Sequence, residues 1–490
     1  MRRCSPLAHK VLHGTEIVWQ TGLWSGAARL GGRTLLVSSS LDDLSVSSHP
    51  RLSFALLNAG VQSVPCTLST YLPTTQAVEA GVEMFRRTGA MSITVVGNGA
   101  VIDAAKGMAD LIDSQRAPGS TALPLLVIPT SISPVGCHPA WSCLHAEDDV
   151  LISRGSQRDD SSTTIVFDAA LLTQGAHGGA SPKAFVSPLV SAVYLASHLV
   201  DSEFSSQLRI TDTTQAVEAS TPLTLSPRLS RLAHYFSGSA GSAPQQQQQQ
   251  QQQVEVGELC QLAETVGAVR RESSSSLSSN PSALGFHDVF PLELTSQLAL
   301  LTGARSLLSP APWPFSWLHV LSLHALVEMT GVGREAGAGA GAGGGMEPEL
   351  LAVAKASIER ISHALGLESS AQFARSVQMA AAAVHQQAAS KQFQSQLQAR
   401  RSTKVRSNQN DADPSNSALS LPVDGAVEGL IAVHEELENA HRTRNNPSAA
   451  RVIRAAGKDD CEKVQDSPRL RLLRSDLFLD LATAATQPPV

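Results

Sequence analysis

Aromatic residues are scarce in this chain of 490 residues, at 4% of the total, so aliphatic side chains and alanine must supply most of the core packing. Charged residues are also few, at 16%, against roughly a quarter in an average protein. The formal net charge is only −6, with a pI near 6.2. We therefore expect no nucleic-acid partner and no anionic-membrane partner, because both require a strongly basic surface.

Cysteine pairs and long apolar runs are missing as well. The six cysteines are scattered without a CxxC pair, which argues against a zinc ribbon and against a disulfide framework. No uncharged apolar stretch reaches about 18 residues, so we expect no membrane span. Met1-Arg2-Arg3 is followed by no long apolar run, so we expect no secretory signal and a cytoplasmic location.

The length and the apolar patterning predict two domains. Hydrophobic residues make up 42% of the chain, which is enough for a sizeable buried core. A chain of 490 residues is too long to fold around a single core, so two domains are expected. In residues 1–182, short apolar runs alternate with helical periodicity, which is typical of a Rossmann-like, doubly wound parallel sheet. The predicted strands are Thr34–Ser39, Ser92–Val96, Leu123–Ile128 and Thr163–Phe167, and the predicted helices are Thr74–Thr88 and Val101–Ile112.

Residues 183–490 predict an all-α domain, because strand signals fade and stretches rich in alanine and leucine take over. The predicted helical stretches are Val186–Val200, Pro291–Leu308, Trp317–Met329, Pro348–Leu365 and Ala371–Leu397. Three glutamine-, glycine- or serine-rich segments, near 238–284, 334–346 and 400–420, bury too little apolar surface to offset the entropy of ordering. We predict that they are flexible insertions, with a regulatory or interaction role as the alternative.

A glycine-rich turn, Gly97-Asn98-Gly99, lies between a predicted strand and a predicted helix. Glycine allows the backbone to approach a phosphate group closely. The first turn of the following helix would direct its N–H groups and its dipole at that anion. This pattern predicts a pyrophosphate site, and the alternative is a tight strand-to-helix turn without a ligand.

The segment Gly97–Lys106 resembles the GGGSxxDxAK signature of the iron-type alcohol dehydrogenases. Asp103 and Lys106 occupy the same places in both. Asn98 stands where the signature has its middle glycine, and Ala100 stands in place of its serine. The chain is therefore identified as similar to a diverged member of that family.

Further segments extend the resemblance over nearly the whole chain, toward the maleylacetate reductase branch. Ile128–Ser131 resembles the family's IPTT segment, and Pro139-Ala140-Trp141 follows at the spacing of that branch. The segment with His319 and His324 resembles its paired-histidine segment. The resemblance implies the dehydroquinate synthase-like architecture, in which a Rossmann-like domain is followed by a helical domain. It also implies a homodimer as one possible oligomeric state.

The family uses NAD or NADP in the cleft between its domains to transfer a hydride to or from a small alcohol, carbonyl or unsaturated substrate. The resemblance places cofactor contacts at the end of the first predicted strand, on the glycine turn with its helix, and on the Pro-Thr segment. The implied residues are Ser38, Ser39, Gly97, Asn98, Gly99, Asp103, Lys106, Thr130 and Ser131. No acidic residue directly follows Ser39, so both NAD and NADP stay open.

Many members of the family bind iron or zinc through one Asp and three His, and the metal polarises the substrate as a Lewis acid. The family's Asp-xxx-His pair falls here on Val190 and Tyr194, and neither residue is a plausible replacement. His198 lies one turn later, without an Asp four residues before it. We therefore expect that the metal ligands are lost.

Three histidines are candidates for proton donation to the substrate. His319 and His324 lie on a predicted helix, and His138 lies next to the Pro-Ala-Trp match. A neutral histidine can donate a proton while a hydride arrives from a cofactor. The alternatives are core histidines that are satisfied by hydrogen bonds and, for His138, a loop histidine that caps a carbonyl.

Three functional hypotheses remain at this stage. The first is a metal-free, NAD(P)-dependent oxidoreductase of the maleylacetate reductase type that acts on a small-molecule substrate. The second is a diverged nucleotide-binding protein with little or no catalysis. The third is a pieced-together reading frame, since low-complexity segments interrupt regions that should carry family residues.

Overall fold

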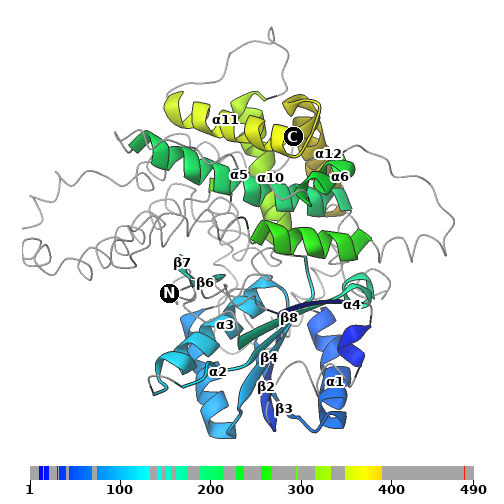
Figure 1. The fold of residues 1–490 in the computed structure, drawn as a ribbon, viewed down its shortest axis with the longest axis vertical. Coiled ribbons are helices and arrows are strands. Elements are labelled where there is room, and N and C mark those ends of the chain that lie inside the picture. The colour runs from blue at the N-terminus through cyan, green and yellow to red at the C-terminus, as the bar shows by residue number, and fades with distance from the viewer. Residues whose placement is uncertain are drawn as a thin grey trace, which may run out of the picture. The chain divides into compact units, whose positions relative to one another are not determined.

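The computed structural model divides the chain into two compact units (Figure 1). The first comprises Met1–Ser191 and Ser239–Gly267, and the second comprises Ala192–Gly238 and Ala268–Val490. The predicted domain boundary at residues 182 and 183 stays a prediction. The structure describes residues 10–14, 16–20, 30, 32–39, 43–68, 74–117, 120–132, 141–145, 151–155, 162–174, 188–212, 228–236, 255–267, 269, 294–295, 315–332, 348–388 and 479.

A six-stranded parallel sheet forms the centre of the first unit, in the order β1-β8-β5-β4-β2-β3. Its central strands are buried along almost their whole length, which explains their continuous apolar runs. The predicted doubly wound sheet is confirmed. The strands are β1 (Lys10–Gly14), β2 (Arg33–Ser39), β3 (Gln62–Leu68), β4 (Ser92–Gly97), β5 (Leu125–Pro129) and β8 (Thr163–Asp168).

Helices cover both faces of this sheet (Figure 1). Helix α1 lies on one face, and α2 and α3 lie on the other. Their bounds are Asp43–Asn58 for α1, Thr75–Thr88 for α2 and Gly99–Ser114 for α3, and a short helix α4 (Ala169–Gln174) follows β8. A 3-10 turn, η1 (Ile17–Trp19), follows β1.

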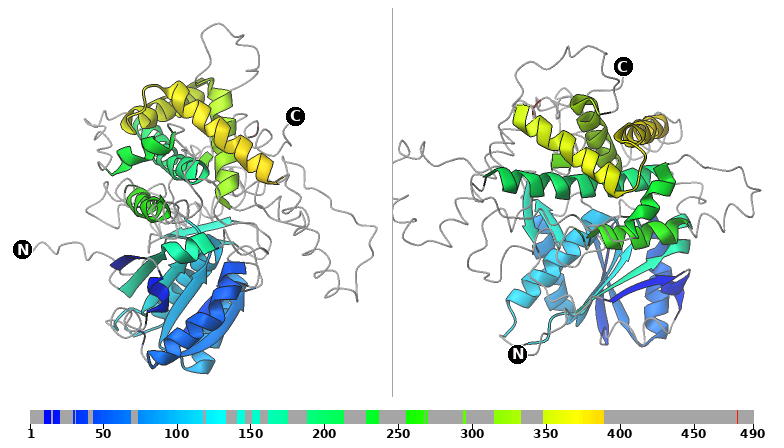
Figure 2. Two further views of the ribbon diagram at one scale, coloured as in Figure 1. Left: turned by 90° about the vertical axis from the view of Figure 1, so that its right-hand side faces the viewer. Right: turned by 45° about the horizontal axis from the view of Figure 1, so that its top comes forward.

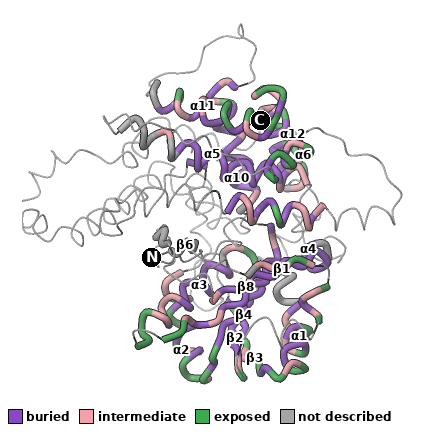
Figure 3. The backbone as a smooth tube through the Cα atoms, viewed as in Figure 1, coloured by how far each residue is buried: buried purple, intermediate pink, exposed green. Residues whose placement is uncertain are grey.

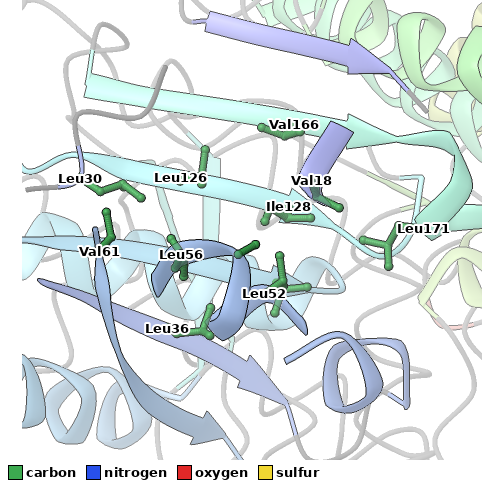
Figure 4. Packing of buried hydrophobic residues seen from close by; sticks show 12 residues of the cluster. Val18, Leu30, Leu36, Leu52, Leu56, Val61, Leu126, Ile128, Val166 and Leu171 are labelled. Atoms are coloured by element: carbon green, nitrogen blue, oxygen red, sulfur yellow. The ribbon is translucent and has the colours of Figure 1, made fainter. Parts of the chain in front are cut away.

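The core between α1 and the sheet consists of aliphatic side chains (Figure 4). Leu52 and Leu56 of α1 belong to the same buried cluster as Leu36 of β2, Ile128 of β5 and Val166 of β8. None of these five side chains exposes more than 1% of its surface. The scarcity of aromatic residues is thus met by interlocking leucine, isoleucine and valine.

Helix α2 illustrates why the predicted boundaries hold. The Thr74 Oγ1 atom accepts a hydrogen bond from the Ala77 N–H at 3.1 Å, and this N-cap begins the helix. Gly89 ends it with φ of 64°, a left-handed conformation that glycine adopts at low cost. Because Val78, Val82 and Phe85 are buried on one face, the helical periodicity predicted over Thr74–Thr88 is confirmed.

The order of the strands reverses between β2 and β4. The connection from β2 runs to the β3 edge, whereas the connections from β4 run through β5 toward β8. Val37 pairs with Val95, and the two strands end two residues later at Ser39 and Gly97. Ligands of doubly wound folds bind outside the carboxyl ends of the strands at such a reversal, so this edge is the natural place for a site.

The described part of the second unit is helical (Figure 2). Helix α5 (Pro188–Asp212) begins just before the division between the units, and α10 (Phe315–Thr330) contacts both α11 (Pro348–Ala364) and α12 (Ser370–Ala388). Two shorter elements are η4 (Leu229–Arg231) and α6 (Leu232–Phe236). Most of the described residues of α5 and α10 are buried (Figure 3), and the predicted all-α character is confirmed for the described residues of this unit.

Several features were not predicted from the sequence. Helix α1, strand β3 and the antiparallel hairpin of β6 (Trp141–His145) with β7 (Leu151–Gly155) carry weak local signals. Residues 255–267 form a helix inside the segment 238–284 that was predicted as an insertion. The predicted insertions at 334–346 and 400–420 lie outside the described residues. Among the described helices, none is both long and apolar enough to span a bilayer.

Candidate functional site

The glycine turn between β4 and α3 is tightly built around Gly97. A Cβ atom at Gly97 would lie 2.8 Å from the Val101 Cβ atom, closer than such atoms approach each other. The Gly97 carbonyl accepts a hydrogen bond from the Thr130 N–H at 2.9 Å. The first turn of α3 therefore closes directly over the end of β4, and the Pro-Thr segment is fixed beside it.

The N-terminus of α3 opens at this edge of the sheet. Asn98 is its N-cap, and the Asn98 Oδ1 atom accepts from the Val101 N–H at 3.4 Å. Gly99 is the first helical residue, where N–H groups have no partner within the helix and the helix dipole is positive. The missing Cβ at Gly97 lets this N-terminus lie against the strand ends, and a pyrophosphate site at the turn stays a prediction.

The structure brings most of the predicted cofactor residues to one edge. Ser38 and Ser39 are buried at the end of β2, next to the end of β4. Thr130 is buried and Ser131 is half-buried, directly after β5. Together with Gly97, Asn98 and Gly99, they form the carboxyl edge at the strand reversal. Their roles in cofactor binding stay predictions.

Asp103 and Lys106 are placed differently, inside the packed body of α3. They are 5% and 0% exposed, and the Lys106 Nζ atom lies 3.8 Å from the Asp103 Oδ1 atom. A buried ammonium requires such a counter-charge, since an isolated one is costly to desolvate. The arrangement joins these two signature residues to each other within the helix.

The predicted proton donors do not form one group. His319 and His324 both lie on α10, but five residues turn a helix by roughly 140° beyond one full turn, so they face different sides. Burial lowers the pKa of His324, and the nearby Glu328 carboxylate opposes that shift. Burial also lowers the pKa of His385 on α12, and His324 adds to the lowering. His138 lies outside the described residues.

His319 instead belongs to a buried cluster with His198 and Asp201 of α5. The exposed fractions of the three residues are 0%, 1% and 0%. Each offers one nitrogen or oxygen atom, and these three atoms lie within 4.8 Å of one another. The His198 and His319 ring centroids are 4.6 Å apart. This donor set, two imidazoles and one carboxylate, suits a divalent transition metal.

Hydrogen bonds orient two of these three side chains. The Ser197 hydroxyl donates to the Tyr194 carbonyl at 2.7 Å, so its oxygen acts as the acceptor toward His319 Nδ1 at 3.3 Å. Neutral His319 thus carries its proton on Nδ1 and its lone pair on Nε2. The Asp201 Oδ1 atom accepts from the Thr295 N–H at 2.7 Å, which fixes the carboxylate.

Tyr194 forms one wall of the cluster. Its ring makes edge contacts with His198 and His319, at centroid distances of 4.9 and 5.2 Å. The resemblance stated from the sequence assigns Tyr194 to the family's second ligand position. His198 lies one turn later on α5, with its ring next to that of His319.

The expectation that the family's metal ligands are lost stays a prediction, and the cluster of His198, Asp201 and His319 is a group of possible ligands that it did not include. His198 lacks an Asp four residues before it, but Asp201 follows three residues later, and this spacing puts both side chains on one face of α5. The His198-x-x-Asp201 pattern was a signal in the sequence that sequence analysis missed. Its pairing with His319 was not accessible, because it depends on how α5 and α10 pack.

Comparisons with known proteins agree with this fold. The family model of the iron-containing alcohol dehydrogenases matches residues 10–140. A mutant of ADH/D1, an archaeal halo-thermophilic alcohol dehydrogenase from a Red Sea brine pool, is 12% identical with a TM-score of 0.50, covering 88% of this chain and 98% of that chain. No curated protein matches the chain by sequence.

Two further crystal structures are similar at lower scores. The iron-containing alcohol dehydrogenase of Thermotoga maritima is 12% identical with a TM-score of 0.47, covering 81% of this chain and 98% of that chain. The maleylacetate reductase of Agrobacterium tumefaciens is 14% identical with a TM-score of 0.44, covering 88% and 97%. The family match includes the glycine turn, and over residues 10–140 it confirms the resemblance to the iron-containing alcohol dehydrogenases that was stated from the sequence.

Proposed function

We propose that the chain is an NAD(P)-dependent oxidoreductase that acts on a small carbonyl, alcohol or unsaturated dicarboxylate, in the manner of maleylacetate reductase. The observation that carries this proposal is the turn at Gly97, where a missing Cβ brings a helix N-terminus against the strand ends. The family match covers this turn. The homodimer and the cytoplasmic location expected from the sequence stay predictions.

The nucleotide would be held by the carboxyl edge of the sheet. The N–H of Gly99 and the dipole of α3 would face the pyrophosphate. Ser38 and Ser39 would face the adenosine ribose from the end of β2, and Thr130 would offer a hydroxyl from the end of β5. The strand end carries no acidic side chain, so the proposal includes both NAD and NADP.

The chemistry that a bound nicotinamide supplies is the transfer of a hydride. The chain's own contribution is a proton donor, and His324 suits this role better than His319. The lowered pKa of His324 keeps its imidazole neutral near pH 7, and a neutral imidazole still carries one N–H to donate. The Nδ1 proton of His319 is engaged with Ser197.

A second function is favoured by two departures from the family pattern. Asn98 replaces a glycine and uses its side chain to cap α3, and Val190 with Tyr194 replaces the family's Asp-xxx-His pair. Both changes are consistent with a diverged nucleotide-binding protein with little or no turnover. This alternative retains the nucleotide site and differs only in its chemistry.

A negative charge introduced at Gly99, the first residue of α3, tests the proposed nucleotide site. Gly99→Asp adds a carboxylate that a helix N-terminus tolerates well but that repels a pyrophosphate. We expect the dissociation constants for NADH and NADPH, followed by nicotinamide fluorescence, to rise about tenfold or more relative to Gly99→Asn, its neutral isostere.

Two outcomes decide between the candidate functions. Equal binding by Gly99→Asp and Gly99→Asn, with both variants folded, contradicts the placement of the pyrophosphate. Saturable binding by the unmodified chain together with turnover of maleylacetate or simple aldehydes supports the oxidoreductase. Saturable binding without turnover of any of these substrates supports the non-catalytic alternative.

A further inference from the structure

One helix from the second half of the sequence belongs to the first unit. Residues 255–267 are helical and lie in the segment Ser239–Gly267, whereas the chain on both sides of that segment belongs to the second unit. We propose that this helix is a releasable strap, fastened to β1 by the hydrogen bond between His13 and Glu264. The inference goes beyond the proposed function, because it requires neither a nucleotide nor turnover.

One face of the strap is apolar and fully buried. Val256, Leu259, Ala263 and Val266 are each 0% exposed, and their spacing of three or four residues puts them on one side of the helix. A helix of this length is marginal by itself in water, so it depends on the surface to which it is docked. Release of the strap should therefore unfold it, and its backbone amides would then exchange with solvent.

The fastening lies on the face of the sheet opposite α1. Leu12 and Val166 pack with the cluster beneath α1, so strand alternation puts their neighbours His13 and Phe167 on the other face. The His13 ring stacks on Phe167, with centroids 5.3 Å apart and planes 13° apart. The His13 Nε2 atom donates to the Glu264 Oε2 atom at 3.1 Å. This bond ties the strap to the β1 end of that face.

The exposure of the fastening makes it releasable. The side chains of His13 and Glu264 are 26% and 30% exposed, so water competes for their bond. Both ends of the strap continue into the second unit, so its opening removes one connection between the units. His13 lies near the carboxyl end of β1, and in the parallel sheet this is the same edge as the turn at Gly97. Opening of the strap would thus alter this edge on its β1 side.

Hydrogen exchange of the full-length chain, followed by mass spectrometry, tests the strap. In the unmodified chain we expect residues 255–267 to exchange faster than the central strand β4, because the strap opens without global unfolding. Glu264→Ala and His13→Leu should each raise exchange of the strap about two- to fivefold, the effect of losing a partly exposed pair, and leave β4 unchanged. The double variant should exceed neither single variant by much, since the same bond is lost in each.

The matched control is Gln261→Ala, because Gln261 is an exposed residue of the same helix. We expect its strap to exchange as in the unmodified chain. Exchange of residues 255–267 as slow as that of β4 overturns the proposal, because the helix would then open only with the whole unit. Equal exchange in Glu264→Ala and Gln261→Ala also overturns it, and so do additive effects of Glu264→Ala and His13→Leu. Failure of the Gly99 experiment leaves these results untouched, so the two proposals fail separately.

Discussion

Asp168 is a buried carboxylate that accepts hydrogen bonds from two separate segments of the first unit. Its carboxylate is fully buried, and its Oδ1 atom accepts from the N–H groups of Ala170 and Leu171 at 3.0 and 3.2 Å, which caps α4. The same carboxylate accepts from the Glu16 N–H at 2.9 Å and the Val18 N–H at 3.0 Å. One side chain thus ties the turn after β1 to the end of β8.

We expect Asp168→Ala to lower the free energy of unfolding by about 2–4 kcal/mol, because it leaves several buried N–H groups without their acceptor. Urea denaturation measures this loss. Asp168→Asn keeps one acceptor oxygen, so its loss should be smaller. A loss below about 1 kcal/mol for Asp168→Ala would show that the turn is held by other contacts.

At the scale of elements, α5 and α11 are joined by an ion pair in which one partner is buried and the other is exposed. The Glu203 carboxylate on α5 is 5% exposed, the Arg360 side chain on α11 is 54% exposed, and their atoms are 3.1 Å apart. Gln207 also donates to the same carboxylate at 2.6 Å. Removal of the arginine leaves a buried carboxylate with a weaker set of partners, which costs more than the loss of a surface pair.

We expect Arg360→Met to destabilise the chain by about 1–2 kcal/mol, against less than about 1 kcal/mol for an exposed pair. The double variant Arg360→Met with Glu203→Gln should recover part of the loss, because no buried charge then remains. Urea denaturation of the two single variants and the double variant gives the coupling energy. A coupling energy near zero would contradict a contribution of the pair to stability.

At the scale of the whole molecule, the chain should be sensitive to mild acid. Burial lowers the pKa of His49 in the first unit and of His324 and His385 in the second, from an ordinary value of 6.5. The unfolded chain therefore binds more protons than the folded chain as the pH falls below 6.5. This stabilisation is complete above that pH and is lost as the pH falls through the lowered pKa values.

We expect the urea midpoint to fall as the pH is lowered from 8 toward about 5.5, a range that spans the ordinary histidine pKa. The variant with His49, His324 and His385 all replaced by Gln should show a flatter dependence. An equally steep dependence in that variant would assign the acid sensitivity to other groups.

Local features explain which parts of the fold were predictable. β2, β4 and β5 are buried on both faces, so their sequences are continuous apolar runs. Strand β3 lies at the edge of the sheet, with several exposed positions and Pro65 within it, so its local signal is weak. Helix α1 contains Pro50 and several serines, which obscure its periodicity.

By itself, the sequence determined the strand–turn–helix at Gly97 and the helical character of the second half, because glycine placement and apolar periodicity are local properties. Only the tertiary structure decided which distant residues meet. The pairing of β2 with β4 brings the strand ends at Ser39 and Gly97 to the same edge of the sheet, and the packing of α5 and α10 places His198 and Asp201 beside His319. Such contacts join residues far apart in the chain, so they depend on how whole elements pack and leave no pattern in any one segment.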